Sequence, residues 1–236
     1  MRFGKRLKNK IMTPDYEYKG KCHIRFFNCG NMDFMKEIPD NYFELCICDP
    51  PYGIDVAARG KVGGNNCGKA KDYGAKDWDK QAPNEEYFSQ LRRVSKNQIV
   101  WGANHFISKL PFDSSCWLVW DKDNSGNFAD CELAWTSFDT AVRKFMWRWN
   151  GMLQQNMKNK EERIHPTQKP VALYDWIIQN YCAEANLILD THVGSGSSRI
   201  AAAKAGKQFI GFEIDKEYYE KQEKRFNDWN SQLRMF

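Results

Sequence analysis

The sequence predicts an α/β fold built on a doubly wound, mostly parallel sheet. Short apolar runs of strand length alternate with helical patterns along most of the chain, which is typical of parallel sheets covered by helices on both faces. The length of 236 residues and the hydrophobic content of 42% suit one sizeable domain. Such sheets bind ligands beyond the carboxyl ends of their strands, so residues at strand ends are the first candidates for a site.

The alternation follows a basic N-terminal arm at residues 1–22, in which five of the first ten residues are Lys or Arg. The next part of the chain contains strand patterns and two helical patterns. The expected strands are 23–30, 43–49, 98–103, 116–122 and 131–138, and the expected helices are 31–39 and 84–95.

The last third predicts a helix, strand, helix, strand and helix at residues 169–182, 186–190, 197–206, 208–215 and 216–229. Pro170 falls in the first turn of the first of these helices, where a proline is tolerated. Gly206 is expected to end the second helix. We therefore expect a single domain over residues 1–236.

Two segments interrupt this order. Residues 53–83 are rich in Gly, Asn and Lys, and we expect a mobile loop there. Residues 139–164 are basic with interleaved aromatic residues, a composition compatible with nucleic-acid binding. A solvated basic strand with tryptophans in the core is the alternative for this second segment.

The composition limits the classes of function. No apolar run approaches the roughly 20 residues needed to cross a bilayer, and the basic N-terminus precedes no apolar signal core, so we expect no membrane partner. The net charge of +5 and a pI near 8.7 allow binding of a polyanion. Eight cysteines include no Cys-x-x-Cys pair. We therefore expect no metal and a reducing cytoplasmic location.

The segment "DPPY", Asp49 to Tyr52, directly follows the apolar run "FELCIC". Two consecutive prolines stop a strand and fix the local backbone. The carboxylate of Asp49 and the ring of Tyr52 are therefore expected on a stiff turn at the end of a strand. A plain rigid turn is the alternative.

The segment "LILDTHVGSGSS" predicts a second site at a strand end. Gly194 and Gly196 allow the backbone to approach a ligand, and a helix begins near Ser197. The turn lacks the glycine spacing of a dinucleotide site and the lysine of a phosphate loop. Glu213 ends the next strand, where a carboxylate can accept both hydroxyls of a ribose. These features favour a nucleoside cofactor without a pyrophosphate, such as S-adenosylmethionine; an ordinary turn with a serine cap is the alternative.

Taken together, "DPPY", "HPTQKP", "DTHVGSGSS" and "GFEID" resemble the S-adenosylmethionine-dependent DNA amino-methyltransferases. The catalytic motif precedes the cofactor motif, as in the beta arrangement of that family. "WGANHF", "WLVWDK" and "ELAWTSF" are similar to small adenine-N6 enzymes of phages and bacteria. The resemblance covers about residues 24–226 and implies a Rossmann-like methyltransferase sheet, mostly parallel with an antiparallel strand, plus a short inserted recognition segment at 139–164.

The resemblance implies a catalytic group of Asp49, Pro50, Pro51 and Tyr52. The Asp49 carboxylate and the Pro50 carbonyl oxygen would accept the two hydrogens of an adenine amino group and so localise its lone pair on nitrogen. Positioning and electrostatics can lower this barrier without a perturbed pKa. Tyr52 would stack on the base, which must first leave the duplex.

The implied cofactor contacts lie on five segments. The methionine part would lie against Asp190, Thr191, Gly194, Ser195 and Gly196, and Glu213 would hold the ribose. Relatives often have Asp where this chain has Asn31, and Asp33 follows two residues later. Asn31 is the preferred contact for the adenine of the cofactor, and Asp33 stays open as the alternative. Further candidates are Thr167 and Lys169, together with Asp49. His165 and His192 could be taken for catalytic bases. His192 stands where many relatives have phenylalanine, so we expect it to pack or to support neighbouring residues.

For nucleic acid, the resemblance and the charge of residues 139–164 point to double-stranded DNA. Arg and Lys supply phosphate contacts, and tryptophans can stack on bases. The candidate residues are Arg143, Lys144, Trp147, Arg148, Trp149 and Arg163. The segment is short, so we expect a short target or help from a second subunit in a homodimer. From position alone, Tyr73 and Trp78 are possible wedges behind a flipped base.

The resulting prediction is a site-specific adenine-N6 DNA methyltransferase of bacterial or phage-infected cytoplasm. Methylation of cytosine N4, methylation of adenine in RNA, and a catalytically silent DNA-binding module of the same fold are the alternatives. Roles in restriction-modification, phage counter-defence and regulation all stay open.

Overall fold

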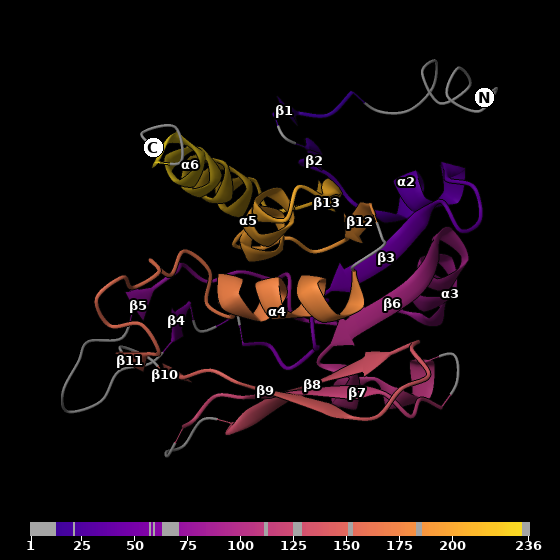
Figure 1. Ribbon diagram of the computed structural model, residues 1–236, viewed down its shortest axis with the longest axis horizontal. Coiled ribbons are helices and arrows are strands. Elements are labelled where there is room, and N and C mark those ends of the chain that lie inside the picture. Colours follow the sequence, from indigo (N-terminus) through magenta and orange to yellow (C-terminus); the bar gives the residue numbers. More distant parts are fainter. Residues whose placement is uncertain are drawn as a thin grey trace.

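The computed structural model describes residues 13–20, 22–56, 58, 60–62, 71–110, 113–124, 129–150, 153–182 and 186–232. In this part of the chain, nine strands form one sheet in the order β1-β2-β13-β12-β3-β6-β8-β7-β9 (Figure 1). The strands are β1 (Tyr16–Lys19), β2 (His23–Phe27), β3 (Phe43–Cys48), β6 (Ser95–Trp101), β7 (Trp117–Asp121), β8 (Cys131–Thr136), β9 (Arg143–Met146), β12 (Leu187–Asp190) and β13 (Gln208–Phe212).

Helices cover both faces of this sheet (Figure 1). They are α2 (Met32–Glu37), α3 (Glu85–Val94), α4 (Val171–Tyr181), α5 (Ser197–Lys204) and α6 (Lys216–Gln232), with short 3-10 turns at Ala103–His105 and Ile107–Lys109. The central strand β3 shows how the sequence builds two cores. Leu45 and Ile47 pack with α4, α5 and α6, whereas Cys46 and Cys48 pack with α2 and α3, because successive strand residues point to opposite faces.

Most neighbouring strands are parallel. The pairs β2–β13, β13–β12, β12–β3, β3–β6 and β7–β9 run parallel, and β1–β2, β6–β8 and β7–β8 run antiparallel. The predicted mostly parallel sheet is therefore confirmed. Strand β8 supplies the antiparallel strand of the prediction, and β1 adds a second one at the edge of the sheet.

The chain order creates a switch point in the middle of the sheet. From β12 the chain passes through α5 to β13 on one side, and from β3 it passes through α3 to β6 on the other. The carboxyl ends of β12 and β3 are neighbours, and the connections that leave them diverge. A crevice opens at such a point in doubly wound sheets. Asp49 directly follows β3 and Asp190 ends β12 at this point.

The three segments set apart in the sequence contain local structure. Within 1–22, residues 16–19 form β1 rather than an arm, and residues 1–12 lie outside the described residues. Within 53–83, β4 (Lys61–Val62) pairs with β5 (Lys71–Asp72), residues 63–70 lie outside the described residues, and the mobility of the segment stays a prediction. Within 139–164, β9 extends the main sheet, and β10 (Trp149–Asn150) pairs with β11 (Leu153–Gln154).

No helix among the described residues is both long enough and apolar enough to span a membrane.

Candidate active site

A cavity of about 970 Å³ lies at the carboxyl ends of β3, β12 and β13. Its lining contains residues from every motif that the sequence singled out. The predicted residues in its wall are Asn31, Asp49, Pro50, Pro51, Tyr52, Trp149, Arg163, Thr167, Lys169, Thr191, Gly194, Ser195 and Glu213. The structure therefore brings together segments that are far apart in the chain.

The centre of this wall is a buried ion pair between Asp49 and Lys169. The Lys169 ammonium lies 2.6 Å from Oδ2 of Asp49 and is 2% exposed. The Tyr52 hydroxyl donates to Oδ1 of Asp49 (2.7 Å) and accepts from Lys169 (3.1 Å). Burial raises the pKa of Tyr52 well above its usual range, so the hydroxyl stays protonated and donates. Both oxygens of Asp49 are thus fixed in direction, and each keeps a further acceptor position.

Lys169 also contacts Glu132 of β8, at 2.9 Å from Oε2, and Lys122 lies 2.5 Å from the other oxygen of Glu132. Burial raises the pKa of Asp49, and the nearby Glu132 charge adds to this, while Lys169 opposes it. Burial acts in the same direction on Glu132, but the two lysines outweigh it and hold the pKa of Glu132 at about 2. Positive and negative side chains therefore alternate in a row that runs from Lys122 through Glu132 and Lys169 to Asp49.

The ring of Tyr52 is held from two sides. It stacks on His105, with ring centroids 4.9 Å apart and an interplanar angle of 14°. Gly102 lies against the Tyr52 ring with φ of 69°, and a Cβ at this position would lie 1.9 Å from Cε1 of Tyr52. The close approach therefore requires a glycine.

We expect Gly102→Ala to reduce methyl transfer by about 10²-fold, because it pushes the Tyr52 ring out of place next to Asp49. Gly74→Ala is the matched control. Gly74 has a similar φ of 74°, but no atom lies within 4 Å of the point that its Cβ would occupy, so it carries the same backbone strain without the contact. Transfer rates and thermal unfolding of both variants are the measurements. Equal loss of transfer in both would contradict the role of the Tyr52 contact.

Asp190 supports the turn after β12 through hydrogen bonds to residues that follow it. The Asp190 carboxylate accepts the N–H of His192 (2.9 Å) and the hydroxyl of Ser198 (2.5 Å). It is buried, and burial raises its pKa to about 7. Gly196 has φ of 79°, and a Cβ there would lie 3.0 Å from the Gln222 side chain. Neither Asp190 nor Gly196 lines the cavity; both shape the turn that presents Thr191, Gly194 and Ser195.

Glu213, at the end of β13, reaches the same turn. One of its carboxylate oxygens accepts the N–H of Gly194 (2.9 Å), and the other accepts the N–H of Asp215 (2.8 Å). Burial raises the pKa of Glu213 to about 7, partly offset by these backbone N–H groups. The carboxylate therefore titrates in the neutral range and lies in the cavity wall.

We expect binding of S-adenosylmethionine to strengthen by up to about tenfold between pH 6 and pH 8, since a group with a pKa of about 7 changes from mostly protonated to mostly ionised over this range. An ionised carboxylate can accept a hydrogen bond from each hydroxyl of a ribose, the role predicted for Glu213, whereas protonation turns one of its oxygens into a donor. Equilibrium binding at several pH values is the measurement. Glu213→Gln should weaken binding and make the affinity depend less on pH. The ligand and Asp190 also titrate, but they do so in the wild type and in the variant alike. An unchanged slope in Glu213→Gln would contradict the assignment.

The adenine candidate Asn31 precedes α2 and faces the same turn. Its amide nitrogen donates to the carbonyl oxygen of Thr191 (2.9 Å) and lies 3.4 Å from Nε2 of His192. The His192 ring packs edge-on against Tyr87, whose hydroxyl bonds to that of Thr191 (2.6 Å). Burial lowers the pKa of His192 to about 4. His192 is therefore neutral at pH 7, and it packs on Tyr87 in the wall of the cavity.

The "HPTQKP" segment places His165 and Thr167 beside Lys169. The His165 ring packs against Tyr218 of α6 (centroids 4.3 Å apart) and Trp78 (5.1 Å). Its Nδ1 lies 3.1 Å from the Thr167 hydroxyl. Burial lowers the pKa of His165 to about 3, with a further contribution from Lys169, so the ring is neutral at pH 7. Trp78, a predicted wedge, is part of this stack, and Tyr73, the other, is buried.

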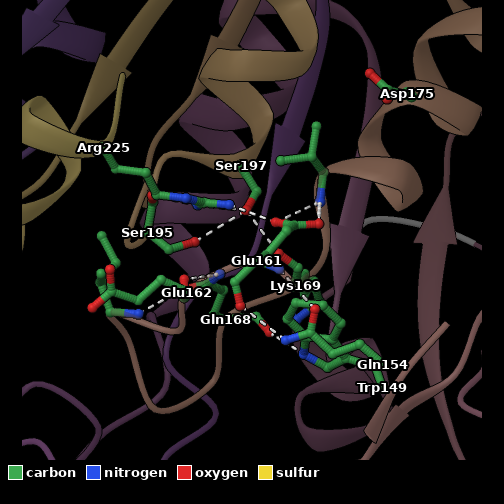
Figure 2. Close-up of polar contacts among 12 residues, drawn as sticks. Trp149, Gln154, Glu161, Glu162, Gln168, Lys169, Asp175, Ser195, Ser197 and Arg225 are labelled. Atoms are coloured by element: carbon green, nitrogen blue, oxygen red, sulfur yellow. Dashed lines mark hydrogen bonds and ion pairs between the residues drawn. The ribbon is translucent and has the colours of Figure 1, made fainter. Parts of the chain in front are cut away.

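Figure 2 shows a partly buried polar network that joins the 139–164 segment to the turn after β12. Arg225 of α6 donates to the Glu161 carboxylate (2.5 Å) and to the carbonyl oxygen of Ser195 (2.8 Å). The same carboxylate accepts the N–H of Val171 at the start of α4 (3.1 Å). Burial raises the pKa of Glu161, with Arg225 opposing it. The part of the segment that carries Glu161 is therefore fixed to the cavity wall.

The six candidate DNA contacts separate into two groups. Arg143, Lys144 and Arg148 are exposed on or next to the edge strand β9; Lys144 pairs with Asp121 (3.2 Å) and Arg148 with Asp123 (2.8 Å). The tryptophans face inward. Trp149 is buried and donates through Nε1 to the carbonyl oxygen of Gln168 (2.8 Å), and Trp147 stacks on Phe145. Arg163 lies over the Trp149 ring in the cavity wall (4.7 Å).

Several residues of the site were not predicted, among them Glu132, His105 and Asp79. The segments "ELAWTSF" and "WGANHF" contain the first two, but no local pattern shows which of their side chains face a cavity. Among the described residues, no group of three or more His, Cys, Asp or Glu side chains could hold a metal.

Comparison with known proteins gives three findings. Residues 119–224 match the model of a family described as DNA methylase. The chain is 25% identical over 253 residues to the Type II methyltransferase M2.MboI of Moraxella bovis, with 89% of this chain and 87% of the relative covered. Solved structures share the fold: M1.HpyAVI in complex with S-adenosylmethionine (SAM) has a TM-score of 0.54, 19% identity and coverage of 86% of this chain and 99% of that chain.

A second structure, the cytosine-N4-specific PvuII DNA methyltransferase, has a TM-score of 0.56 and 13% identity and covers 86% of each chain. At these identities the two structures establish the fold alone. They confirm the predicted Rossmann-like class, and they show that this fold occurs in an enzyme with another target base.

Proposed function

We propose that this chain, a member of the S-adenosylmethionine-dependent DNA amino-methyltransferases, transfers a methyl group to the N6 amino group of an adenine extruded from the DNA helix. The observation that supports this most directly is the position of Asp49. Its carboxylate is fixed at the end of β3, in the wall of the cavity that also contains Gly194 and Glu213.

The fixed orientation of Asp49 fits the chemistry of an amino group. Oδ1 and Oδ2 are each directed by one donor, Tyr52 or Lys169, and each can accept one more hydrogen bond. The Asp49 carboxylate and the Pro50 carbonyl oxygen would accept the two amino hydrogens and localise the nitrogen lone pair. Preorganised acceptors of this kind lower the barrier because they do not reorganise during the reaction.

The other half of the cavity fits S-adenosylmethionine, which supplies an electrophilic methyl group when bound. Glu213 offers a carboxylate for the ribose, and Asn31 offers an amide for the adenine. The Gly194 backbone has φ of 55°, a conformation that favours glycine, and the missing side chain allows a ligand to approach the backbone closely. The turn carries no lysine or arginine for a phosphate.

The choice of adenine depends on Asp49. The resembling adenine enzymes have Asp before the Pro-Pro pair, whereas Ser at this position favours cytosine N4. The fold alone does not distinguish the two bases. The test is incubation of the protein with labelled S-adenosylmethionine and random-sequence DNA, followed by mapping of modified bases at single-nucleotide resolution. N4-methylcytosine as the product would refute the adenine assignment, and absence of any product would refute the enzymatic proposal.

Several finer predictions accompany this function. Arg143, Lys144 and Arg148 offer an exposed basic edge for DNA phosphates, whereas Trp149 is buried in the wall of the cavity. A homodimer, action in a bacterial or phage-infected cytoplasm and a role beside a restriction enzyme stay predictions. Sedimentation with and without DNA would measure the oligomeric state.

A further inference from the structure

Asp79 is a buried carboxylate that binds the backbone of the catalytic turn. It is 1% exposed. Oδ1 accepts the N–H groups of Tyr52 (2.8 Å) and Gly53 (3.0 Å), and Oδ2 accepts the N–H of Val56 (2.9 Å). The N–H of Asp55 donates to the Asp79 carbonyl oxygen (3.1 Å). Four backbone N–H groups of one short turn therefore donate hydrogen bonds to a single residue.

The chain that follows Asp79 also packs closely against the catalytic turn. Gly53 has φ of 72°, and a Cβ at this position would lie 2.8 Å from the backbone nitrogen of Ala82. The chain around Asp79 thus packs directly against the turn that begins at Asp49. Buried backbone N–H groups need an acceptor, and a charged acceptor gives the stronger hydrogen bonds.

The position of Asp79 is itself fixed from the cofactor side of the cavity. Trp78 packs on His165, and Lys76 pairs with Asp215 (3.0 Å) and Glu217 (2.7 Å) at the start of α6. Asp215 in turn donates its N–H to Glu213. Residues 76–79 therefore span from the beginning of α6, next to the ribose candidate, to the catalytic turn.

We propose that Asp79 is a positioning residue for methyl transfer: its carboxylate holds residues 52–56 so that Asp49 and the Pro50 carbonyl oxygen face the target amino group. Both of its oxygens are engaged by backbone donors, so Asp79 acts through the turn and not as a base. This inference rests on the proposed function, because it assigns a role within that reaction.

The test compares Asp79→Ala and Asp79→Asn with Glu44→Gln. Glu44 is the matched control: its carboxylate also accepts two backbone N–H groups, those of Asn186 (2.8 Å) and Leu187 (2.7 Å), but at the opposite end of the sheet from the cavity. The DNA is a duplex that contains a site modified by the wild-type chain. The measurements are the single-turnover transfer rate at saturating substrates, the Kd of S-adenosylmethionine and the thermal unfolding midpoint.

We expect Asp79→Ala to slow transfer by about 10²-fold, because small displacements of a reacting group have effects of this size. Asp79→Asn keeps one acceptor oxygen and should slow transfer by about 10-fold, as expected for the loss of a hydrogen bond worth about 1.4 kcal/mol. Cofactor Kd should change by less than about threefold in both. Glu44→Gln should lower the unfolding midpoint while transfer stays near the wild-type rate.

Each other result has a distinct meaning. If the wild-type chain transfers no methyl group, the proposed function fails. If the wild type is active and Asp79→Asn transfers at the wild-type rate, the inference is overturned, whether or not Asp79→Ala folds. It is also overturned if Glu44→Gln slows transfer as much as Asp79→Asn, because the effect would then follow from stability alone.

Discussion

Asp49→Ala is expected to reduce methyl transfer by at least about 10²–10³-fold, the effect of removing one preorganised electrostatic group from an active site, while the Kd of S-adenosylmethionine changes only several-fold. The carboxylate is the acceptor whose two oxygens are directed by Tyr52 and Lys169. The predicted ribose contact lies elsewhere, on Glu213. Transfer and cofactor binding should therefore separate in this variant.

Asp49→Asn is the matched variant for the charge, because it keeps the size and one acceptor oxygen of the side chain. It should retain more transfer than Asp49→Ala. Single-turnover transfer, equilibrium cofactor binding and thermal unfolding, measured on the same preparations, distinguish the outcomes. Equal losses of transfer and cofactor affinity would show that Asp49 serves the cofactor or the fold instead of the amino group.

The strand ends were predictable because their signals are local. The apolar run before Asp49 predicted a strand over 43–49, and β3 covers Phe43–Cys48; two prolines force the chain out of the strand at that point. Residues 186–190 likewise contain β12 (Leu187–Asp190). The predicted strand 208–215 was too long at its end, because β13 covers Gln208–Phe212 and Glu213 follows it. An apolar run bounded by a turn fixes both the strand and the position of the residue that follows it.

The partners of the motif residues were not predictable in the same way. Lys169 was a candidate cofactor contact, but its ammonium pairs with Asp49 and Glu132. Glu132 comes from β8, whose antiparallel place between β6 and β7 depends on the arrangement of the whole sheet. Nothing within "ELAWTSF" determines that neighbour.

Asp190 and Trp149 illustrate a second limit, the direction of a side chain. Asp190 ends β12 as expected, yet its carboxylate turns back to Ser198 and the His192 N–H. Trp149 lies in the basic segment as expected, yet its ring is buried and bonds to Gln168. A polar or aromatic residue at the right position can bind a ligand or support the chain that does, and tertiary contacts decide between the two.

Lys169→Met is expected to destabilise the protein by about 3–5 kcal/mol at pH 8, the cost of removing one partner from a buried ion pair. The Lys169 side chain is 2% exposed and lies between Asp49 and Glu132. Without its charge, Lys122 is the cation that remains beside the two carboxylates, and it pairs with Glu132. Burial and the repulsion between the carboxylates then raise the pKa of Asp49 further and raise that of Glu132 above its wild-type value.

The sign of the pH dependence follows from these raised pKa values. A carboxyl group with a folded-state pKa above the unfolded value destabilises the fold progressively as the pH rises from the unfolded value through the folded one. The difference in unfolding free energy between wild type and Lys169→Met should therefore widen from pH 5 to pH 8, as measured by urea denaturation. The double variant Lys169→Met/Glu132→Gln removes one of the two charges and should recover part of the loss at pH 8 and little at pH 5. An equal loss at both pH values, with no recovery in the double variant, would mean that the lysine stabilises the site through packing of its aliphatic chain rather than through its charge.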